Sequence, residues 1–291
     1  TSLLTLKVDR QRLRLLPPEL CLLPALVELD AGYNELGGAL VLHAPGLPSL
    51  RRLVLRWWWS AQVRHWRRQR IDADLIDPAT CTLVGGVDVS FVKESETEAC
   101  AALVVLSLPS LEVVYETYAR VELEVPYIPG YLAFREAKSL LDLLAELRRA
   151  KPHLFPHLVL VDGNGILHPQ KFGLACHLGV RGKVATVGVA KNLFVIDGLT
   201  RDGVRAAAAE ACAASGDSCP LVGASGYTWG AALRTTDGEG FNPVYVSAGH
   251  GLTLESSLEL VRRCCRHRVP EPVRQADLRS RERLRDDAGC S

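Results

Sequence analysis

Two aspartates lie in apolar runs that are typical of buried strands. Asp88 lies in the middle of Val-Gly-Gly-Val-Asp-Val-Ser-Phe (residues 84–91), where a carboxylate is costly unless it is paired, protonated or bound to a metal ion. Asp162 ends the run 158–162, and the carboxyl end of a parallel strand is where open α/β sheets bind ligands. Both residues also have non-catalytic explanations. Asp88 could face outward from its strand, and Asp162 could cap its own turn.

Three further side chains could complete such a site. Glu136 lies four and seven residues before Leu140 and Leu143, so at 3.6 residues per turn it shares the apolar face of its own helix. Lys191 follows an apolar strand-like run, and His250 lies between two glycines just before an expected helix. A salt-bridged glutamate, a surface lysine and a loop histidine remain the alternatives.

Together these residue types predict metal-assisted phosphodiester hydrolysis. Carboxylate oxygens without a Cys/His cluster favour Mg²⁺ or Mn²⁺ over zinc. A metal held by Asp88, Glu136 and Asp162 could polarise a phosphate and generate hydroxide. Lys191 could neutralise charge that develops on the phosphate, and His250 could carry a proton.

The order of expected elements predicts the fold that positions these residues. Three β-rich runs joined by short links predict antiparallel neighbours, and later strands alternate with helices, as in a ribonuclease H-like mixed sheet flanked by helices. We expect strands at 83–92, 101–108, 111–124, 158–161 and 183–189 and near 221, 230–234 and 244–246, and helices at 132–149, 204–214 and 253–266. The fold class is therefore α/β.

The first part of the chain reads differently from the rest. Residues 26–36 fit L-x-x-L-x-L-x-x-N-x-L with Ala31 at the third Leu position, and similar units lie about 23 residues to either side. We interpret residues 1–56 as a leucine-rich-repeat-like segment, either the tail of a truncated array or an incorrectly joined segment. Two or three uncapped units should be unstable alone. Two alternatives stay open: the segment could be a cap that packs on the following domain, or it could bind a protein partner.

Composition divides the chain further. Residues 51–70 hold seven Arg and four Trp without an acid, which suits either a nucleic-acid surface or, as we favour, a connecting helix that packs its Trp face. The predicted parts are the leucine-rich-repeat-like segment 1–56, a basic-aromatic connecting helix 57–80, a nuclease domain 81–270 and an Arg-rich tail 271–291. The tail either extends the nucleic-acid surface or forms a solvated helix.

The overall composition excludes several classes of protein. With 48% hydrophobic and 23% charged residues, the chain cannot be wholly disordered. A net charge of +1 does not by itself indicate binding to nucleic acid or to a membrane. Its apolar runs are too short to span a bilayer, and no signal peptide is recognisable. Nine cysteines without a C-x-x-C pair predict reduced thiols and no structural zinc, and hence a cytoplasmic protein that could also reach the nucleus.

Five long motifs, in fixed order, resemble the endonuclease V family in its vertebrate type. They are VGGVDVSF, PYIPGYLAFRE, VDGNGILHPQKFGLACHLG, VGVAKNL and VSAGHGLTLESSLELV, and the resemblance runs from about Trp66 to Arg285. It implies a ribonuclease H-like fold, use of Mg²⁺ or Mn²⁺, and hydrolysis of the second phosphodiester bond 3′ to inosine in RNA or deoxyinosine in DNA. It also implies that the matching positions here are catalytic: Asp88, Glu136 and Asp162 as metal ligands, with Lys191 and His250.

The same resemblance implies where the substrate binds. A wedge of two prolines around an aromatic ring would replace the stacking lost when the base is displaced, and a pocket of backbone and small residues would reject guanine's exocyclic amine. The matching residues are Pro126, Tyr127, Ile128 and Pro129 in the wedge, Gly130, Leu132, Gly163 and Gly165 in the base pocket, and His168 beside a phosphate. Residues 169–171, Pro-Gln-Lys, depart from the family's usual Arg-Gly-containing step.

Three functions remain to be distinguished. The sequence favours an endonuclease that cuts single-stranded RNA at inosine, and the vertebrate-type motifs tilt the choice toward RNA. A DNA repair endonuclease acting at deoxyinosine is the nearest alternative, because a contact to one 2′-hydroxyl would separate the two. A leucine-rich interaction protein with an inactive nuclease fold is a third, against which the complete set Asp88, Glu136 and Asp162 argues.

Overall fold

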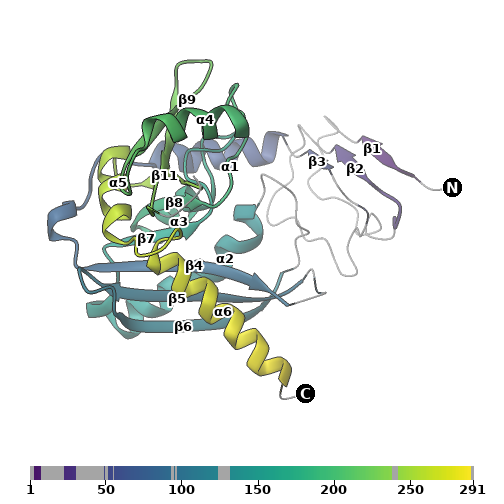
Figure 1. The fold of residues 1–291 in the computed structure, drawn as a ribbon. Coiled ribbons are helices and arrows are strands. Elements are labelled where there is room, and N and C mark those ends of the chain that lie inside the picture. The colour runs from purple at the N-terminus through teal and green to yellow at the C-terminus, as the bar shows by residue number, and fades with distance from the viewer. Residues whose placement is uncertain are drawn as a thin grey trace.

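A computed structural model describes residues 3–7, 23–30, 49, 52–54, 56–92, 95, 97–123, 132–237 and 242–289 of the chain. Its centre is an eight-stranded mixed sheet in the order β6-β5-β4-β7-β8-β11-β10-β9 (Figure 1). β4, β7 and β8 are parallel, and the other neighbours pair antiparallel. The strands are β4 (Leu83–Phe91), β5 (Glu98–Ser107), β6 (Val113–Glu122), β7 (Leu158–Asp162), β8 (Ala185–Ala190), β9 (Ser218–Val222), β10 (Thr228–Leu233) and β11 (Val244–His250). This sheet confirms the predicted fold class.

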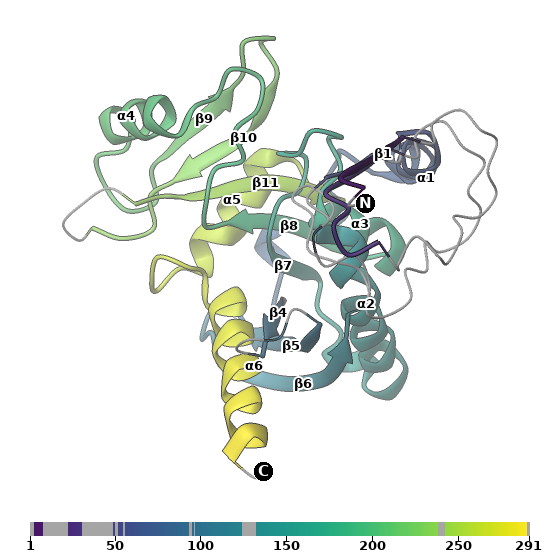
Figure 2. The same cartoon turned by 90° about the vertical axis from the view of Figure 1, so that its right-hand side faces the viewer.

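Helices cover both faces of the sheet. Figure 2 shows α2 and α6 on opposite sides of the β4–β5–β6 region. The helices are α1 (Arg56–Gln69), α2 (Leu132–Ala150), α3 (Leu174–Gly182), α4 (Arg201–Ala211), α5 (Leu254–Arg263) and α6 (Glu271–Gly289), with short 3₁₀ turns η2 (Pro78–Thr80) and η3 (Pro152–Leu154).

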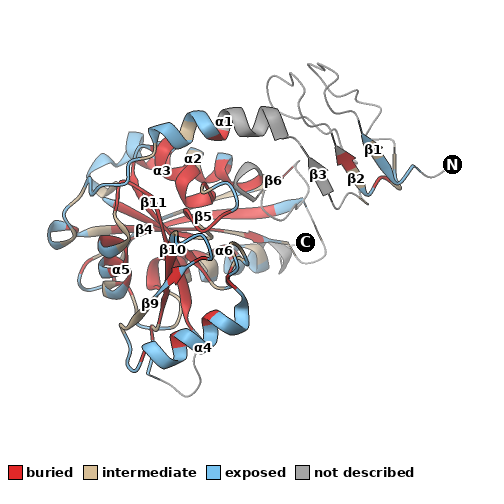
Figure 3. Ribbon diagram, turned by 90° about the horizontal axis from the view of Figure 1, so that it is seen from above, coloured by how far each residue is buried: buried red, intermediate tan, exposed pale blue. Residues whose placement is uncertain are grey.

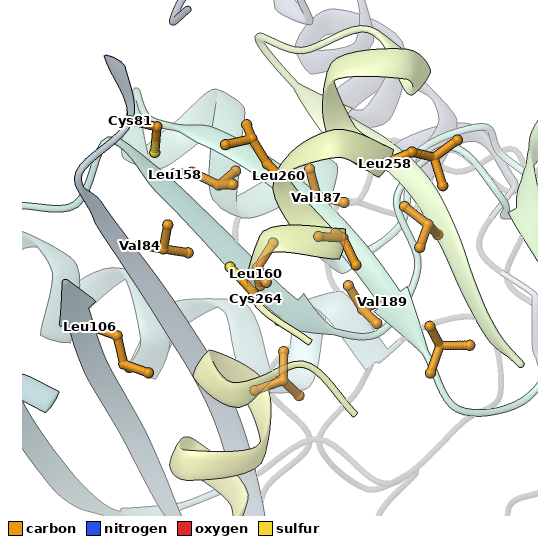
Figure 4. Packing of buried hydrophobic residues seen from close by; sticks show 14 of the residues in the cluster. Cys81, Val84, Leu106, Leu158, Leu160, Val187, Val189, Leu258, Leu260 and Cys264 are labelled. Carbon is orange, nitrogen blue, oxygen red and sulfur yellow. The ribbon is translucent and has the colours of Figure 1, made fainter. Parts of the chain in front are cut away.

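Alternate residues of the central strands pack against different helices, as the period of two requires. On β7, Val159 and Val161 belong to the cluster that includes α2 and α3, whereas Leu158 and Leu160 belong to the cluster that includes α5 and α6 (Figure 4). These strands are therefore buried on both sides (Figure 3), and an ionisable side chain at their ends enters an environment of low polarity.

Helix α3 was not predicted. Eight of its nine residues are buried, so the segment has no polar face from which a helical period could be recognised. Lys183 follows this helix as its C-cap at φ 50°, and for that reason β8 begins at Ala185 rather than at the predicted residue 183.

Helix α6 also differs from the expectation drawn from composition. We expected α5 to close the domain and residues 271–291 to form an Arg-rich tail, but α6 lies against β4 and β5 (Figures 1 and 2). Val273 and Ala276 are fully buried in the main cluster. Gly86 allows this approach, because a Cβ there would overlap the backbone carbonyl of Pro272. Gly86 of β4 thus accommodates the start of α6.

A second, small sheet lies at the N-terminal end of the described chain (Figure 1). Its three strands, β1 (Thr5–Lys7), β2 (Glu28–Asp30) and β3 (Arg52–Val54), pair in parallel in that order. Thr5 pairs with Glu28 and Glu28 with Arg52, so successive strands are 23 and 24 residues apart. This spacing matches the expected repeat. The division of the chain into domains stays a prediction.

The cysteines of the described ranges are free thiols. Cys264 is fully buried and Cys265 partly so, and burial raises the pKa of the Cys265 thiol to about 12. A buried thiol that resists ionisation behaves as a small hydrophobic side chain. Within the described ranges, no helix has the length and apolar character needed to cross a bilayer.

Candidate active site

The three parallel strands bring Asp88, Asp162 and Lys191 to one place. Val87 pairs with Val161, so the next residues, Asp88 on β4 and Asp162 on β7, lie level with each other. Asp162 pairs with Val189 on β8, and Lys191 follows the end of that strand. Because all three strands run in the same direction, their carboxyl ends meet at one edge of the sheet, where ligands bind in open α/β folds.

These side chains line an open cavity of about 950 Å³. Its walls come from the ends of β4 and β7, the residue after β8, and one side of α6. The lining residues are Asp88, Val89, Ser90, Phe91, Val92, Asp162, Lys191, Asp277, Arg281, Leu284 and Arg285. The cavity therefore combines three carboxylates with three basic side chains at the edge predicted to hold the site.

Lys191 and Asp162 form a half-buried ion pair. The ammonium nitrogen Nζ of Lys191 lies 2.6 Å from Oδ2 of Asp162, and the side chains are 31% and 21% exposed. Burial lowers the pKa of Lys191, but the charge and hydrogen bond of Asp162 and the charges of Asp277 and Asp88 together raise it, and the net shift is upward. Lys191 is thus a fixed cation at neutral pH, as an electrostatic role requires.

Asp88 is held by two hydroxyl groups. Ser90 Oγ donates to Asp88 Oδ2 at 3.1 Å, and Ser280 Oγ from α6 lies 3.4 Å from the same oxygen. Burial, followed by the negative charges of Asp162 and Asp277, raises the pKa of Asp88 to about 6. This carboxylate is therefore crowded by like charge, which a cation would relieve.

Glu136 is buried on the other side of the sheet. It lies on α2 together with buried Leu140, Leu143 and Leu147, which confirms the predicted apolar face. Burial, and then the charge of Asp88, raises the pKa of Glu136 to about 8. The pKa of Glu136 therefore depends on the charge of Asp88, but Glu136 is not among the residues that line the cavity.

The donors fit a hard divalent cation by their chemistry, although they do not form a closed set. Asp88, Asp162, Asp277 and Glu136 all offer carboxylate oxygens, and the pKa values of Asp88 and Glu136 are raised where these charges crowd. Within the described ranges, no three His, Cys, Asp or Glu side chains lie close enough together to hold an ion. The predicted ligand set of Asp88, Glu136 and Asp162 thus stays a proposal.

His250 differs from its predicted setting. It is the last residue of β11 and is buried, rather than part of a loop. Its Nδ1 accepts a hydrogen bond from the backbone N–H of Ile71 at 3.1 Å. Burial, and then the charge of Arg70, lowers the pKa of His250. The neutral ring therefore carries its proton on Nε2, and His250 does not line the cavity.

The loop after β7 positions the remaining predicted residues that the structure describes. Gly163 adopts φ +149°, and Gly165 packs so closely on β11 that a Cβ would overlap the carbonyl of Ala248. His168 is buried, and its Nδ1 accepts from the backbone N–H of Gln170 at 3.2 Å. The predicted wedge and base-pocket residues Pro126, Tyr127, Ile128, Pro129 and Gly130, and the side chain of Leu132, lie outside the described residues.

The basic-aromatic helix α1 packs where its side chains are described. The ring of Trp66 meets His177 of α3 edge-on with centroids 5.2 Å apart, and the guanidinium of Arg181 lies 5.3 Å from the Trp66 ring. Trp66 therefore supports the packed helix over the nucleic-acid surface. The side chains of Trp57, Trp58 and Trp59 lie outside the described residues.

Sequence reasoning missed the contribution of α6. Asp277 lines the cavity, and Ser280 is fully buried with its hydroxyl 2.7 Å from that of Ser90. The signal that could have found them is the helical spacing of Asp277, Arg281 and Arg285, each four residues after the last.

Comparison with known proteins gives concordant similarities. Residues 65–278 match the family described as endonuclease V. The chain is 46% identical to human endonuclease V over 256 residues, which cover 86% of this chain and 89% of the human protein. Mouse endonuclease V is also 46% identical, over 79% of this chain and 70% of the mouse protein.

Solved structures agree. The crystal structure of the human protein has a TM-score of 0.73 at 46% identity, and it covers 79% of this chain and 98% of that one. Endonuclease V of Ciona intestinalis, in complex with DNA containing an inosine followed by a ribo-adenosine, has a TM-score of 0.75 at 33% identity, over 79% of this chain and 96% of that one.

Proposed function

The chain belongs to the endonuclease V family and is an endonuclease, and from this premise we propose that it hydrolyses the second phosphodiester bond 3′ to inosine in single-stranded RNA, with a divalent cation, Mg²⁺ or Mn²⁺. The observation that carries the proposal is the convergence of Asp88 within β4, Asp162 at the end of β7 and Lys191 just after β8, in a cavity that Asp277 also lines.

Asp88 and Asp162 are the residues that would hold the cation, with Glu136 and Asp277 adding negative charge nearby. A bound cation supplies polarisation of the phosphate and stabilisation of the oxygen that leaves. The raised pKa values of Asp88 and Glu136 support this role, because a cation in the cavity would favour the ionised carboxylates.

The basic and imidazole groups have separate roles. Lys191, fixed against Asp162, can offset the negative charge that develops on the phosphate. His250 carries its proton on Nε2 at neutral pH, so it can donate a hydrogen bond from that nitrogen. Uptake of a second proton at Nδ1 would break the hydrogen bond from Ile71. Tyr127 in the wedge and the base-pocket residues keep the roles that the family resemblance implies.

The choice of RNA is supported by the substrate of one relative. The relative from Ciona intestinalis was crystallised with a ribonucleotide directly after the inosine. A ribonucleotide differs from its deoxy form only by the 2′-hydroxyl, which is the group that lets a protein distinguish RNA from DNA. The alternative substrate is DNA that contains deoxyinosine.

The experiment is a cleavage map on matched strands. RNA and DNA oligonucleotides of one sequence, each with inosine, adenosine or guanosine at one position, are incubated with the protein in Mg²⁺, Mn²⁺ or EDTA. We expect one cut in the inosine RNA, at the second bond on its 3′ side, and none in EDTA. Equal cutting of adenosine RNA, or full activity in EDTA, would overturn the proposal, and faster cutting of DNA would replace its substrate.

A further inference from the structure

One side of α6 presents charge to the cavity in a regular row. Asp277, Arg281 and Arg285 are spaced four residues apart and therefore lie along one face of the helix. The orientation of this face is fixed, because Ala276 and Ser280 on the neighbouring face are fully buried against the sheet, as is Val273 one turn before Asp277. The row leads outward from the carboxylates along the cavity wall.

Other arginines of the helix are engaged elsewhere. Arg279 pairs with Glu116 of β6 at 2.7 Å, and Arg274 pairs with Glu271 one turn earlier at 3.4 Å. Among the α6 side chains described, Arg281 and Arg285 are the arginines that line the cavity. The fold therefore places these two arginines at the cavity, whereas Arg274 and Arg279 of the same basic helix form ion pairs elsewhere.

The two guanidinium groups remain accessible. Arg281 contacts Asp277 at 2.8 Å, but its side chain is 60% exposed, and Arg285 is exposed and donates through Nε to the backbone carbonyl of Arg281. Each keeps N–H donors that face solvent, in the planar arrangement that suits phosphate oxygens. Four residues of helix rise about 6 Å, so two neighbouring phosphates of an extended strand can each meet one arginine.

The charge of the cavity points the same way. Three carboxylates (Asp88, Asp162, Asp277) face three basic side chains (Lys191, Arg281, Arg285). A divalent cation added to this balanced set leaves net positive charge, which an anionic ligand would neutralise. A sugar-phosphate backbone supplies that charge at regular intervals.

We propose that Arg281 and Arg285 form a phosphate track, a binding site for the sugar-phosphate backbone of the substrate strand beside the bond that is cut. The proposal rests on the proposed function, since it assumes a nucleic-acid strand in the cavity. It adds a binding surface on α6 that reads the backbone and not the base, so it contributes affinity without contributing to the choice of inosine.

The test measures binding without turnover. Fluorescence anisotropy in EDTA follows a short single-stranded inosine RNA as salt rises, with the wild type, Arg285→Gln, and the double variant Arg281→Gln/Arg285→Gln. Each phosphate contact contributes about 0.7 to the slope of log K against log salt for single strands. The loss of affinity caused by one substitution should therefore shrink about 2.6-fold between 50 and 200 mM salt, and that of the double variant about 7-fold.

Matched variants control for charge and folding. Arg283→Gln removes one positive charge from a position on α6 that does not line the cavity, and it should leave the slope unchanged. The double lysine variant Arg281→Lys/Arg285→Lys should keep the wild-type slope, because lysine also neutralises a phosphate. Arg285 is exposed, so its substitution should not alter the thermal unfolding midpoint.

Strands shortened on either side of the inosine locate the track. The loss of affinity caused by Arg285→Gln should disappear with the strand from which the contacted phosphates have been removed. It should persist with the strand that is shortened on the opposite side of the inosine. An unchanged salt slope for the double variant would overturn the phosphate track. We expect the double variant to keep the wild-type preference for inosine over adenosine. If the wild type itself showed no such preference, the proposed function would be overturned instead.

Discussion

The hydroxyl oxygens of Ser90 and Ser280 lie 2.7 Å apart, 190 residues apart in the chain, and both reach toward Oδ2 of Asp88. The first belongs to the strand that carries Asp88, and the second to the last helix. Ser280 is fully buried, and its hydroxyl also lies 3.0 Å from the backbone carbonyl of Asp277 one turn earlier on α6. The carboxylate of Asp88 is therefore oriented from two elements at once.

Replacing Ser90 with alanine should shift the pH dependence of cleavage. The hydroxyl of Ser90 holds the pKa of Asp88 below the value that burial and neighbouring charge would set, so its loss raises that pKa further. A hydrogen bond to a charged group is worth about 1.5–3 kcal/mol, so the acid limb of kcat/KM should move up by about one to two pH units. Ser110→Ala, on the surface, is the control. An unmoved limb in Ser90→Ala would argue against Asp88 as a group that must ionise.

Asp88→Asn and Asp162→Asn should each reduce cleavage on the order of 10³-fold and leave RNA binding measurable, because they remove proposed metal ligands and not base contacts. Single-turnover rates in Mg²⁺ and anisotropy in EDTA separate the two effects. Asp142→Asn alters an exposed aspartate that pairs with Lys138 and should keep wild-type rates. Wild-type turnover in either of the first two variants would disprove their assignment.

The free energy of unfolding of the metal-free protein should fall with rising pH on account of Glu136. Its pKa rises from 4.5 to about 8 on folding, so the folded state binds the proton more tightly than the unfolded state. This contribution is complete below pH 4.5 and is lost as pH rises through about 8. Urea unfolding in EDTA at pH 6 and pH 9 should show a larger loss for the wild type than for Glu136→Gln. Equal losses would contradict the raised pKa.

Tyr127 should act by stacking and not by proton transfer, since a phenol with a pKa of about 10 is a poor base near neutrality. Tyr127→Phe should stay close to the wild type. Tyr127→Ala should lose about 10- to 100-fold in kcat/KM, because a base–aromatic contact is worth roughly 1–3 kcal/mol. The loss should be larger on paired than on unpaired inosine. Equal damage from the two variants would indicate a role for the hydroxyl.

Deleting residues 1–56 should leave an active nuclease with a nearly unchanged Tm. Strands β1, β2 and β3 pair with one another, and in the described part of the chain they share no extensive contact with the eight-stranded sheet. Calorimetry and the inosine cleavage assay on the shortened protein test this. Loss of soluble, active protein would show that the segment supports the nuclease fold.

The elements that could be predicted from sequence are those with one-sided patterns or interrupted apolar runs. The leucines that follow Glu136 at helical spacing located α2 to within one residue at its end. An aspartate inside β4 and another at the end of β7 were visible because each breaks a run of buried residues. Parallel strands then bring those two carboxylates together.

The parts that could not be predicted have no such pattern. The apolar anchors of α6 are small or few, Val273 and Ala276 among many charged residues, so the segment resembles a solvated tail. The glycines around His250 suggested a loop, but Gly249 is small because a Cβ there would overlap the backbone of Thr186. Close packing between strands and a flexible turn call for the same residue type, and only tertiary structure separates them.

The packing of α6 against Gly86 can form only late in synthesis of the chain. Ser280 is made 192 residues after Asp88, when every strand of the eight-stranded sheet has already been made. A growing chain can therefore complete the sheet while the strip of β4 around Gly86 is still uncovered and the Asp88 carboxylate still lacks its second hydroxyl partner. The nascent nuclease domain gains its full cavity only when α6 docks, so the proposed activity is acquired after the sheet is complete.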